Sequence, residues 1–362
     1  MKKGVPPPFV IDAVRAVDRA LERAQRRMAP PSAIVLQMVA DRWRPQALGV
    51  VARLGIADRL AGGPVAVSEL ARATETNEDA LGRVLRALAR DGVFAEPTPG
   101  TFANNTLSEV LKTDHPSSMR HTVIQTTSTR NNTCWDRLED SVRTGEPVFT
   151  KLFGKDLWGY FEDHPKEAEH FHGSMQELTR MSAPLIAAAY DFGRFKSIVD
   201  IGGGSGELLA TVLAAHPGLR GAVYDLEAAV VEAPETFRKA GLEARAEVLR
   251  GSFFDRIPDG FDAALMKHIA HGYSDDAIAP VLEKVRKALG PNGTLVVVEM
   301  LVPDTNDGTH PAFLDLQMLV GSANGRERTR DDFERLFKRA GLELADVIRT
   351  ISPVTLLVAK AG

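Results

Sequence analysis

The stretch from Val199 to Glu207, with the sequence VDIGGGSGE, constrains the fold of this chain more than any other segment. An apolar segment, Ser197–Ile201, leads into the glycines, and a segment of helical character, Leu208–Ala215, follows them. A strand, a glycine loop and a helix in this order let the backbone approach a ligand closely and direct N–H groups toward it. The motif predicts a nucleotide-like binding loop, with a tight turn that binds nothing as the simpler alternative.

The spacing of these glycines differs from that of two common phosphate-binding loops. Glu207 stands where a dinucleotide-binding loop has its third glycine, and no Lys-Ser or Lys-Thr pair follows as it does in a P-loop. A nucleotide-like ligand without a pyrophosphate is therefore favoured, and S-adenosylmethionine is the leading candidate.

Composition restricts the class of protein. The chain has 362 residues, of which 44% are hydrophobic, so it can bury a large core and we expect two domains. A net charge of −4 argues against a nucleic-acid partner. The single cysteine, Cys134, excludes an internal disulfide, and neither a signal peptide nor an apolar run of about 20 residues is present. We expect a cytoplasmic protein without a membrane partner.

The N-terminal region is predicted to be helical. Val10–Met28 has apolar residues at helical spacing and a charged opposite side, typical of a helix packed on its own domain or on a partner subunit. Further helices are expected over Ala47–Leu60, after a Ser68 cap, and from an Asn77 cap to Arg90.

A short β-ribbon over residues 93–102 follows these helices, an order that resembles a winged helix. Arg83, Arg86 and Arg90 lie opposite the apolar stripe of the last helix, where a DNA-reading helix would carry basic residues. The acidic start of that helix, Glu78 and Asp79, favours an ordinary solvated face instead.

Residues Asp136–Ala189 are predicted to be wholly helical and to connect the two halves of the chain. They carry enough aromatic and sulfur side chains for one wall of an apolar pocket, although each could equally be a core residue. These side chains are Trp158, Tyr160, Phe161, Phe171, Met175 and Met181.

The second half of the chain alternates between strands and helices. Strands are expected at Ser197–Ile201, Gly221–Tyr224, Val248–Leu249, Ala263–Met266 and Thr294–Val298. This alternation predicts a parallel, doubly wound sheet that binds ligands at the carboxyl ends of its strands.

Polar residues follow several of these strands. Asp225 comes about 20 residues after the glycine loop, where an acidic side chain can accept both hydroxyls of a ribose, or could simply cap the next helix. Ser252 and Phe253 follow the third strand, near the expected position of an adenine.

Two histidines, His268 and His271, follow the fourth strand with a spacing that could place both on one helical face. This is also metal-ligand spacing, but no third ligand is visible nearby in the sequence, so we predict no metal site. A general base is the better interpretation, because imidazole titrates near neutral pH and one nitrogen can accept a proton while a carboxylate holds the other. Glu299 and Glu327 are the candidate carboxylates.

Motifs spread along the chain together resemble one family. The glycine loop is followed in order by KHIAHGYSDD at residues 267–276, by Val298-Glu299 and by GRERT at residues 325–329. This order resembles the S-adenosylmethionine-dependent O-methyltransferases of the caffeic-acid type, whose bacterial members tailor aromatic natural products such as antibiotics. Residues 143–145, 171–175 and 189–192 are similar too, so the resemblance covers nearly the whole chain.

The resemblance implies an α/β fold with a Rossmann-like, doubly wound methyltransferase sheet and an N-terminal helical winged-helix domain that forms a homodimer. The implied domains are residues 1–115 for dimerisation, 116–190 for a helical connector that contributes to the substrate pocket, and 191–362 for S-adenosylmethionine binding and catalysis.

It also implies site residues. The general base would be His271, oriented by Glu299 and Glu327. A small aromatic acceptor would be flanked by Phe171, Met175, His268 and Met318. The S-adenosylmethionine site would be lined by Gly202, Gly204, Asp225, Leu226, Ser252, Phe253 and Lys267.

Two departures from the family pattern concern the chemistry. The family usually has His-Asp-Trp where this chain has His271-Gly272-Tyr273, and Ser252 replaces an aspartate that many members direct at the adenine. These departures keep open C- or N-methylation, or a non-methylating reaction on the same scaffold. A winged-helix regulator that senses S-adenosylmethionine is a further alternative, which the acidic net charge disfavours.

Overall fold

The computed structural model describes residues 28–303, 311–321 and 324–362, together with residues 10, 13, 14, 16, 17, 20, 21 and 24. The helix expected over Val10–Met28 thus lies largely outside the described residues. The chain divides into a sheet unit, mainly Cys134–Asp163 and Thr179–Gly362, and a helical unit, mainly Ala20–Thr133 and His164–Leu178. No helix among the described residues has the length and apolar character needed to cross a membrane.

The sheet unit is built on a seven-stranded sheet of order β6-β5-β4-β7-β8-β10-β9. The first five strands in this order pair in parallel, as expected, but β10 pairs antiparallel with both β8 and β9. The strands are β4 (Ser197–Ile201), β5 (Arg220–Asp225), β6 (Ala246–Arg250), β7 (Ala263–Lys267), β8 (Thr294–Met300), β9 (Leu342–Arg349) and β10 (Val354–Ala361).

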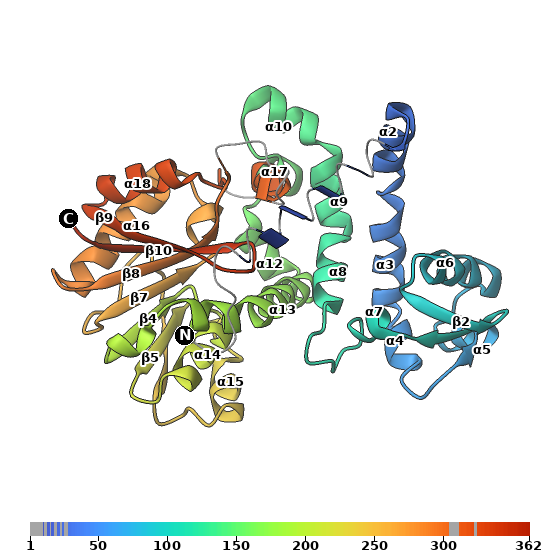
Figure 1. The fold of residues 1–362 in the computed structure, drawn as a ribbon, viewed down its shortest axis with the longest axis horizontal. Helices are drawn as coiled ribbons and strands as arrows, with labels where there is room; N and C mark the ends of the chain where they lie inside the picture. The colour runs from blue at the N-terminus through green and yellow to red at the C-terminus, as the bar shows by residue number, and fades with distance from the viewer. Residues whose placement is uncertain are drawn as a thin grey trace. The chain divides into compact units, whose positions relative to one another are not determined.

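Helices cover both faces of this sheet, as Figure 1 shows. One apolar core packs α14 and α15 on one face, and a second core packs α16 and α18 on the other. The central strands are buried on both sides, which is why they have continuous apolar sequences. The helices of this unit, including two 3-10 turns, are α10 (Leu138–Thr144), α11 (Phe149–Phe153), α12 (Leu157–Asp163), η1 (Phe192–Arg194), α14 (Glu207–Ala215), α15 (Ala233–Lys239), η2 (Ala270–Gly272), α16 (Asp275–Leu289), α17 (Pro311–Gly321) and α18 (Arg330–Arg339).

The helical unit has its own core and a three-stranded sheet of order β1-β3-β2 (Figure 1). The side chain of Asn77 accepts a hydrogen bond from Ala80 N and begins α6, as predicted. Its elements are α2 (Pro31–Ala40), α3 (Trp43–Arg53), α4 (Ile56–Arg59), β1 (Val65–Ala66), α5 (Val67–Ala73), α6 (Glu78–Arg90), β2 (Phe94–Thr98), β3 (Thr101–Asn104), α7 (Thr106–Glu109), α8 (Arg120–Thr126) and, up to Thr133, α9 (Thr129–Asp136). The long helix α13 (Pro165–Ala189) belongs to this unit up to Leu178 and to the sheet unit from Thr179.

Three helix predictions are wrong in detail. The expected helix over Ala47–Leu60 is two helices, because Gly55 has a left-handed φ of 63° that ends α3. Ser68 lies inside α5 rather than at its cap. Residues Asp136–Ala189 are interrupted rather than wholly helical, because Gly145 and Gly154 have left-handed φ values of 74° and 73° and end α10 and α11.

Candidate active site

The glycine loop lies at the carboxyl end of β4, the central strand of the parallel part of the sheet. Gly202, Gly204 and Gly206 have φ values of 71°, 53° and 76°, which other residues rarely adopt. A Cβ on Gly202 would collide with Ile269 Cδ1, whereas a Cβ on Gly204 would meet no protein atom within 4 Å. The loop is thus packed against protein at Gly202 and open at Gly204.

Asp225, at the end of the neighbouring strand β5, holds this loop by hydrogen bonds. Its Oδ2 accepts a hydrogen bond from Gly204 N at 3.0 Å, and its Oδ1 accepts one from Leu226 N at 2.7 Å. Each carboxylate oxygen can accept more than one hydrogen bond, so this arrangement is compatible with ribose binding. The structure therefore brings Gly204, Asp225 and Leu226 together at the expected position.

The residues after β6 lie beside the same loop. Phe253 Cε1 is 3.8 Å from the position of a Cβ on Gly202, and the side chain is buried in the core. The neighbouring Phe254 is 40% exposed and packs edge-on against Tyr273. Ser252 accepts a hydrogen bond from Phe254 N through its Oγ at 3.1 Å, so its hydroxyl also has a local structural role.

Two buried ionisable residues interact with each other near the loop, Asp200 on β4 and Lys267 at the end of the neighbouring β7. Burial raises the pKa of Asp200 to about 7, and its Oδ2 has no hydrogen-bond partner in the described part of the chain. Burial lowers the pKa of Lys267 to about 8, and its Nζ donates to Thr179 Oγ1 at 3.2 Å. Asp200 is not among the site residues predicted from the sequence, although an acid inside an apolar strand before a glycine loop is a usable signal.

These features fit S-adenosylmethionine. The open position at Gly204 and the carboxylate of Asp225 suit a nucleoside, and the unsatisfied acceptor of Asp200 suits a cationic group such as an amino-acid ammonium. Gly202, Gly204, Asp225 and Leu226 would hold the ribose end, and Phe253 would lie beside the base.

The second part of the site is centred on His271 in the turn η2. Its Nδ1 lies 2.6 Å from Glu327 Oε1 and 3.8 Å from Glu299 Oε2, and its backbone N donates to Glu299 Oε1 at 3.2 Å. Both carboxylates are fully buried, whereas the imidazole of His271 keeps 15% of its surface exposed. An Nδ1–H that donates to a carboxylate leaves Nε2 as the acceptor, which is the tautomer that a general base requires.

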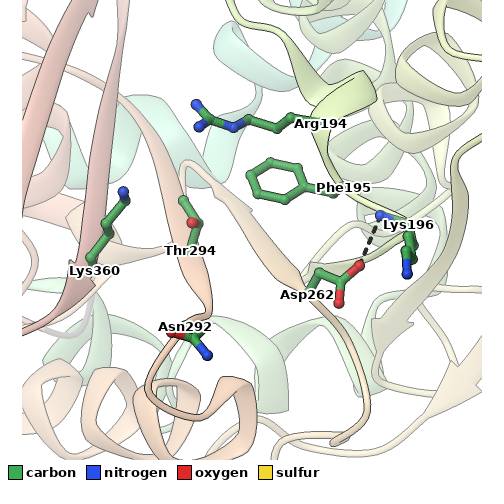
Figure 2. Close-up of a pocket in the computed structure, with 7 residues that line it drawn as sticks. All are labelled: Arg194, Phe195, Lys196, Asp262, Asn292, Thr294 and Lys360. Carbon is green, nitrogen blue, oxygen red and sulfur yellow. Dashed lines mark hydrogen bonds between the residues drawn. The ribbon is translucent and has the colours of Figure 1, made fainter.

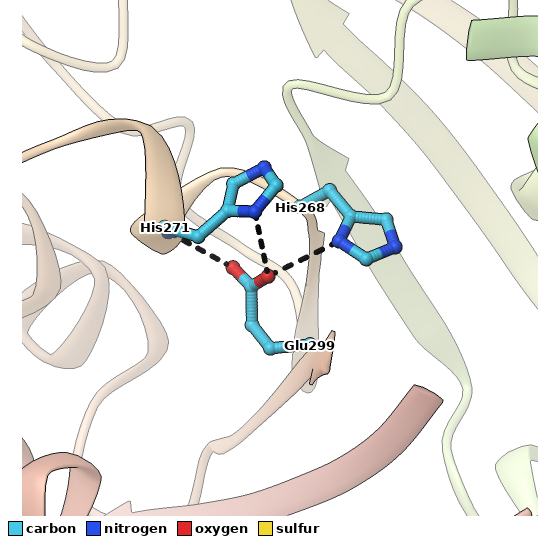
Figure 3. A group of neighbouring side chains, drawn as sticks. All are labelled: His268, His271 and Glu299. Atoms are coloured by element: carbon cyan, nitrogen blue, oxygen red, sulfur yellow. Dashed lines mark hydrogen bonds and ion pairs between the residues drawn. The ribbon is translucent and has the colours of Figure 1, made fainter. Parts of the chain in front are cut away.

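His268 lies on the other side of Glu299, as Figure 3 shows. Its Nδ1 is 3.2 Å from Glu299 Oε2, and its ring centroid is 5.0 Å from that of His271. The prediction that both histidines lie on one helical face is wrong, because His268 precedes η2 and has a left-handed φ of 53°. A tight turn brings the two rings together instead, and Glu299 from β8 lies between them.

Burial and charge set the protonation states. Burial lowers the pKa of His268 to about 4, so this imidazole is neutral at pH 7. Burial also acts to lower the pKa of His271, but the Glu299 and Glu327 carboxylates outweigh it and raise that pKa above its usual value. Burial raises the pKa of Glu327, whereas for Glu299 the two imidazoles outweigh burial and lower it.

Arg328 holds the turn that carries His271, a role not predicted from the sequence. Its fully buried guanidinium donates to Ala270 O and Tyr273 O at 2.7 and 2.8 Å and pairs with Asp275. Arg326 N also donates to His271 O at 2.8 Å. The segment carrying Glu327 is thereby bonded to the turn on both sides of the histidine.

The predicted acceptor-site residues belong to different units. Met318 lies half-buried on α17 in the sheet unit, which also contains His268 and His271. Phe171 and Met175 lie on the part of α13 that belongs to the helical unit. Their role at an acceptor site stays a prediction.

A separate cavity of about 370 Å³ lies elsewhere in the sheet unit, at the amino ends of β4, β7 and β8 (Figure 2). Ligands of doubly wound sheets bind at the carboxyl ends of the strands, so this cavity is not the candidate active site. Its lining residues are Arg194, Phe195, Lys196, Asp262, Asn292, Thr294 and Lys360.

Comparisons with known proteins agree with this architecture. Residues 135–343 match the model of an O-methyltransferase domain, and residues 36–114 match an O-methyltransferase dimerisation domain. The chain is 34% identical to the phenazine O-methyltransferase PhzM of Lysobacter antibioticus, covering 91% of this chain and 96% of the relative. It is 37% identical to the mitomycin biosynthesis 6-O-methyltransferase of Streptomyces lavendulae, covering 86% and 88%.

A solved structure of a third protein is also similar. The O-methyltransferase NcsB1 from neocarzinostatin biosynthesis, in complex with S-adenosylmethionine and 2-hydroxy-5-methyl naphthoic acid, is 30% identical to this chain. The match has a TM-score of 0.75 and covers 88% of this chain and 96% of the other.

Proposed function

Because the chain belongs to the S-adenosylmethionine-dependent O-methyltransferase family, we propose that it methylates a hydroxyl group of a small aromatic compound, with His271 as the general base. S-adenosyl-L-methionine is its cofactor. The observation that carries the base assignment is the 2.6 Å contact between His271 Nδ1 and Glu327 Oε1, since it directs the lone pair of Nε2 away from the carboxylates.

The proposed roles follow from these contacts. When bound, S-adenosylmethionine would supply a methyl group on its sulfonium, with S-adenosylhomocysteine as the leaving group. His271 Nε2 would take the proton that the acceptor hydroxyl loses as its oxygen bonds to the methyl carbon. Glu327 orients the imidazole through Nδ1, and Glu299 fixes the backbone of the turn through His271 N. Both carboxylates also stabilise the imidazolium that forms, because a cation beside buried negative charge is favoured.

The acceptor class is proposed from the relatives and from the surfaces of this chain. NcsB1 is named in complex with a hydroxylated naphthoic acid, and the other two relatives are named for phenazine and mitomycin. Within the sheet unit, we expect Met318 to make an apolar contact with a flat ring, and His268 to lie beside its hydroxyl. A phenol has an ordinary pKa near 10, so its proton is removed during attack rather than before it.

The test is a screen of hydroxylated aromatic acids and fused-ring phenols with S-adenosylmethionine that carries a labelled methyl group. We expect a mass increase of one labelled methyl on an aromatic oxygen, together with S-adenosylhomocysteine. Label on a nitrogen or carbon atom would instead support N- or C-methylation, the alternatives that the departures at Gly272 and Ser252 keep open. Cofactor binding without transfer to any aromatic compound would contradict the proposal.

The protonation state of His271 predicts the pH profile. His271 acts as a base only when it is neutral, so kcat/KM should rise with pH through the pKa of its imidazole. Glu327→Gln removes one of the negative charges that raise this pKa, while the amide oxygen can still accept from Nδ1. The acidic limb of kcat/KM should therefore move to lower pH, measured from about pH 5 to pH 9.

The matched control is Glu283→Gln, which removes an exposed carboxylate that pairs with Lys287. Its profile should coincide with that of the wild type. An acidic limb that stays in place in Glu327→Gln, or moves to higher pH, would argue against His271 as the base.

We also propose that the chain forms a homodimer through its N-terminal dimerisation domain. Against the described part of the chain, the helix α2 buries none of its residues, and its apolar side chains are mostly exposed. Leu36 and Val39 are 68% and 63% exposed, and Trp43 at the start of α3 is 70% exposed. An apolar surface of this kind is typical of an interface between subunits.

A charged substitution on α2 tests this interface. Leu36→Glu should yield a monomer in size-exclusion chromatography with light scattering, because a buried carboxylate without a partner is strongly unfavourable in an apolar interface. Ala87→Glu, which adds the same charge at an exposed position of α6, should stay dimeric. A wild type that is monomeric at micromolar concentration would contradict the dimer.

A further inference from the structure

The two histidines and Glu299 form a cluster that the proposed methyl transfer does not fully use. One ring nitrogen of His268, one ring nitrogen of His271 and a carboxylate oxygen of Glu299 all lie within 4.8 Å of one another. The three side chains come from the β7–η2 turn and from the end of β8, and Figure 3 shows both rings directed at the same carboxylate. The methyl-transfer chemistry requires only one of these imidazoles as a base.

The spacing is close to that of metal ligands. Ligand atoms about 2.0–2.1 Å from a tetrahedral ion lie roughly 3.4 Å from one another. His268 Nδ1 and His271 Nδ1 are 3.2 Å and 3.8 Å from Glu299 Oε2. These two distances bracket the separation expected for ligand atoms of one ion.

The chemistry of these groups also suits a cation. Two imidazoles and one carboxylate are the ligand set of Zn²⁺ and related transition metals, whereas Mg²⁺ prefers an octahedron of oxygens. A metal binds imidazole through a nitrogen that carries no proton, and it binds a carboxylate in its ionised form. The imidazoles of His268 and His271 keep 17% and 15% of their surface exposed, so an ion can reach them.

We propose that His268, His271 and Glu299 form a binding site for one Zn²⁺ ion, and that the ion switches off the base. Ligation through His271 Nδ1 requires that nitrogen to be deprotonated, which moves the remaining proton to Nε2. The nitrogen available to the acceptor then donates a proton instead of accepting one. The site goes beyond the proposed methyl transfer, and only its inhibitory effect rests on His271 as the base.

Metal binding itself is the first test. Wild-type protein dialysed against Zn²⁺ should retain one ion per chain, and Co²⁺ used as a visible probe should give the intense d–d bands of a four- or five-coordinate site. His268→Gln should weaken Zn²⁺ binding by at least about tenfold, because it removes a ligand. The fold of each variant is checked by circular dichroism and thermal unfolding.

The matched control is His170→Gln in the helical unit. His170 Nδ1 lies 3.0 Å from His121 Nδ1, so this pair is the alternative histidine site in the described chain. Binding that survives His170→Gln and is lost in His268→Gln supports the proposal. Binding lost in His170→Gln, binding unchanged in His268→Gln, or no bound Zn²⁺ overturns it.

A second measurement uses the wild-type protein, so it does not depend on whether a variant folds. In a wild-type crystal soaked with Zn²⁺, an anomalous peak should lie between the two Nδ1 atoms and the Glu299 carboxylate. If anomalous peaks occur only at other positions, the proposal is overturned. Zn²⁺ should also inhibit methyl transfer without competing with S-adenosylmethionine, and a chelator should restore it, while Mg²⁺ should have no effect. Bound Zn²⁺ with undiminished methyl transfer would instead contradict His271 as the base.

Discussion

Replacing His271 by alanine is expected to lower kcat for methyl transfer by about 10²- to 10⁴-fold, the range typical of removing a general base. The dissociation constant for S-adenosylmethionine should stay close to that of the wild type, because the proposed ribose contacts are at Gly204, Asp225 and Leu226 rather than at His271. Residual activity should persist, since holding the acceptor oxygen in line with the methyl group contributes independently of the base. Single-turnover kinetics and calorimetric titration of the cofactor measure the two effects separately.

His115→Ala is the control for this substitution. His115 accepts a hydrogen bond from Ser117 N in a turn of the helical unit, and it has no part in the proposed chemistry. Its kcat should match that of the wild type. An unchanged kcat in His271→Ala would contradict His271 as the base. A loss of affinity for S-adenosylmethionine as large as the loss of kcat would show that the histidine acts through the cofactor site.

Replacing Asp225 by alanine is expected to have the largest effect on cofactor binding. The proposed contacts are two hydrogen bonds from ribose hydroxyls to an ionised carboxylate, and such bonds contribute about 1.5–3 kcal/mol each. Their loss should raise the dissociation constant for S-adenosylmethionine by at least about 10²-fold. The substitution also removes the acceptor for Gly204 N and Leu226 N, so it loosens the loop as well.

Two further variants separate these contributions in the same titration. Asp225→Asn keeps one side-chain oxygen acceptor and should lose less affinity than Asp225→Ala. Glu227→Gln, two residues away, changes an 82% exposed carboxylate that pairs with Arg250 and should leave the affinity unchanged. A dissociation constant in Asp225→Ala equal to that of the wild type would place the ribose elsewhere.

Much of the sheet unit could be predicted because its signals are local. Ser197–Ile201 is β4 with the predicted bounds, and the helix after the glycine loop begins one residue earlier than expected. Continuous apolar runs indicate strands buried on both faces, and glycines at positive φ indicate the turn between them. The predicted fold class and cofactor are confirmed by the similarity to O-methyltransferases.

Predictions were wrong where the same residues were compatible with more than one local backbone conformation. Gly55, Gly145 and Gly154 each end a helix in the left-handed conformation, but a glycine inside an apolar-periodic segment does not by itself show which conformation it adopts. The strands β9 and β10 were not predicted. Strand pairing is a contact between distant residues, so the antiparallel position of β10 beside β8 is not encoded in a local pattern.

The sequence by itself determined the strand–loop–helix motif, Asp225 at the next strand end, and the presence of His271, Glu299 and Glu327 as chemically suitable groups. Only the tertiary structure decided how they meet: Glu299 lies between two imidazoles, Glu327 lies 2.6 Å from one of them, and Asp200 lies buried near the loop. The physical reason is distance along the chain. A glycine turn depends on neighbouring residues, whereas the charge, burial and ligand geometry around His271 depend on segments 28 and 56 residues away.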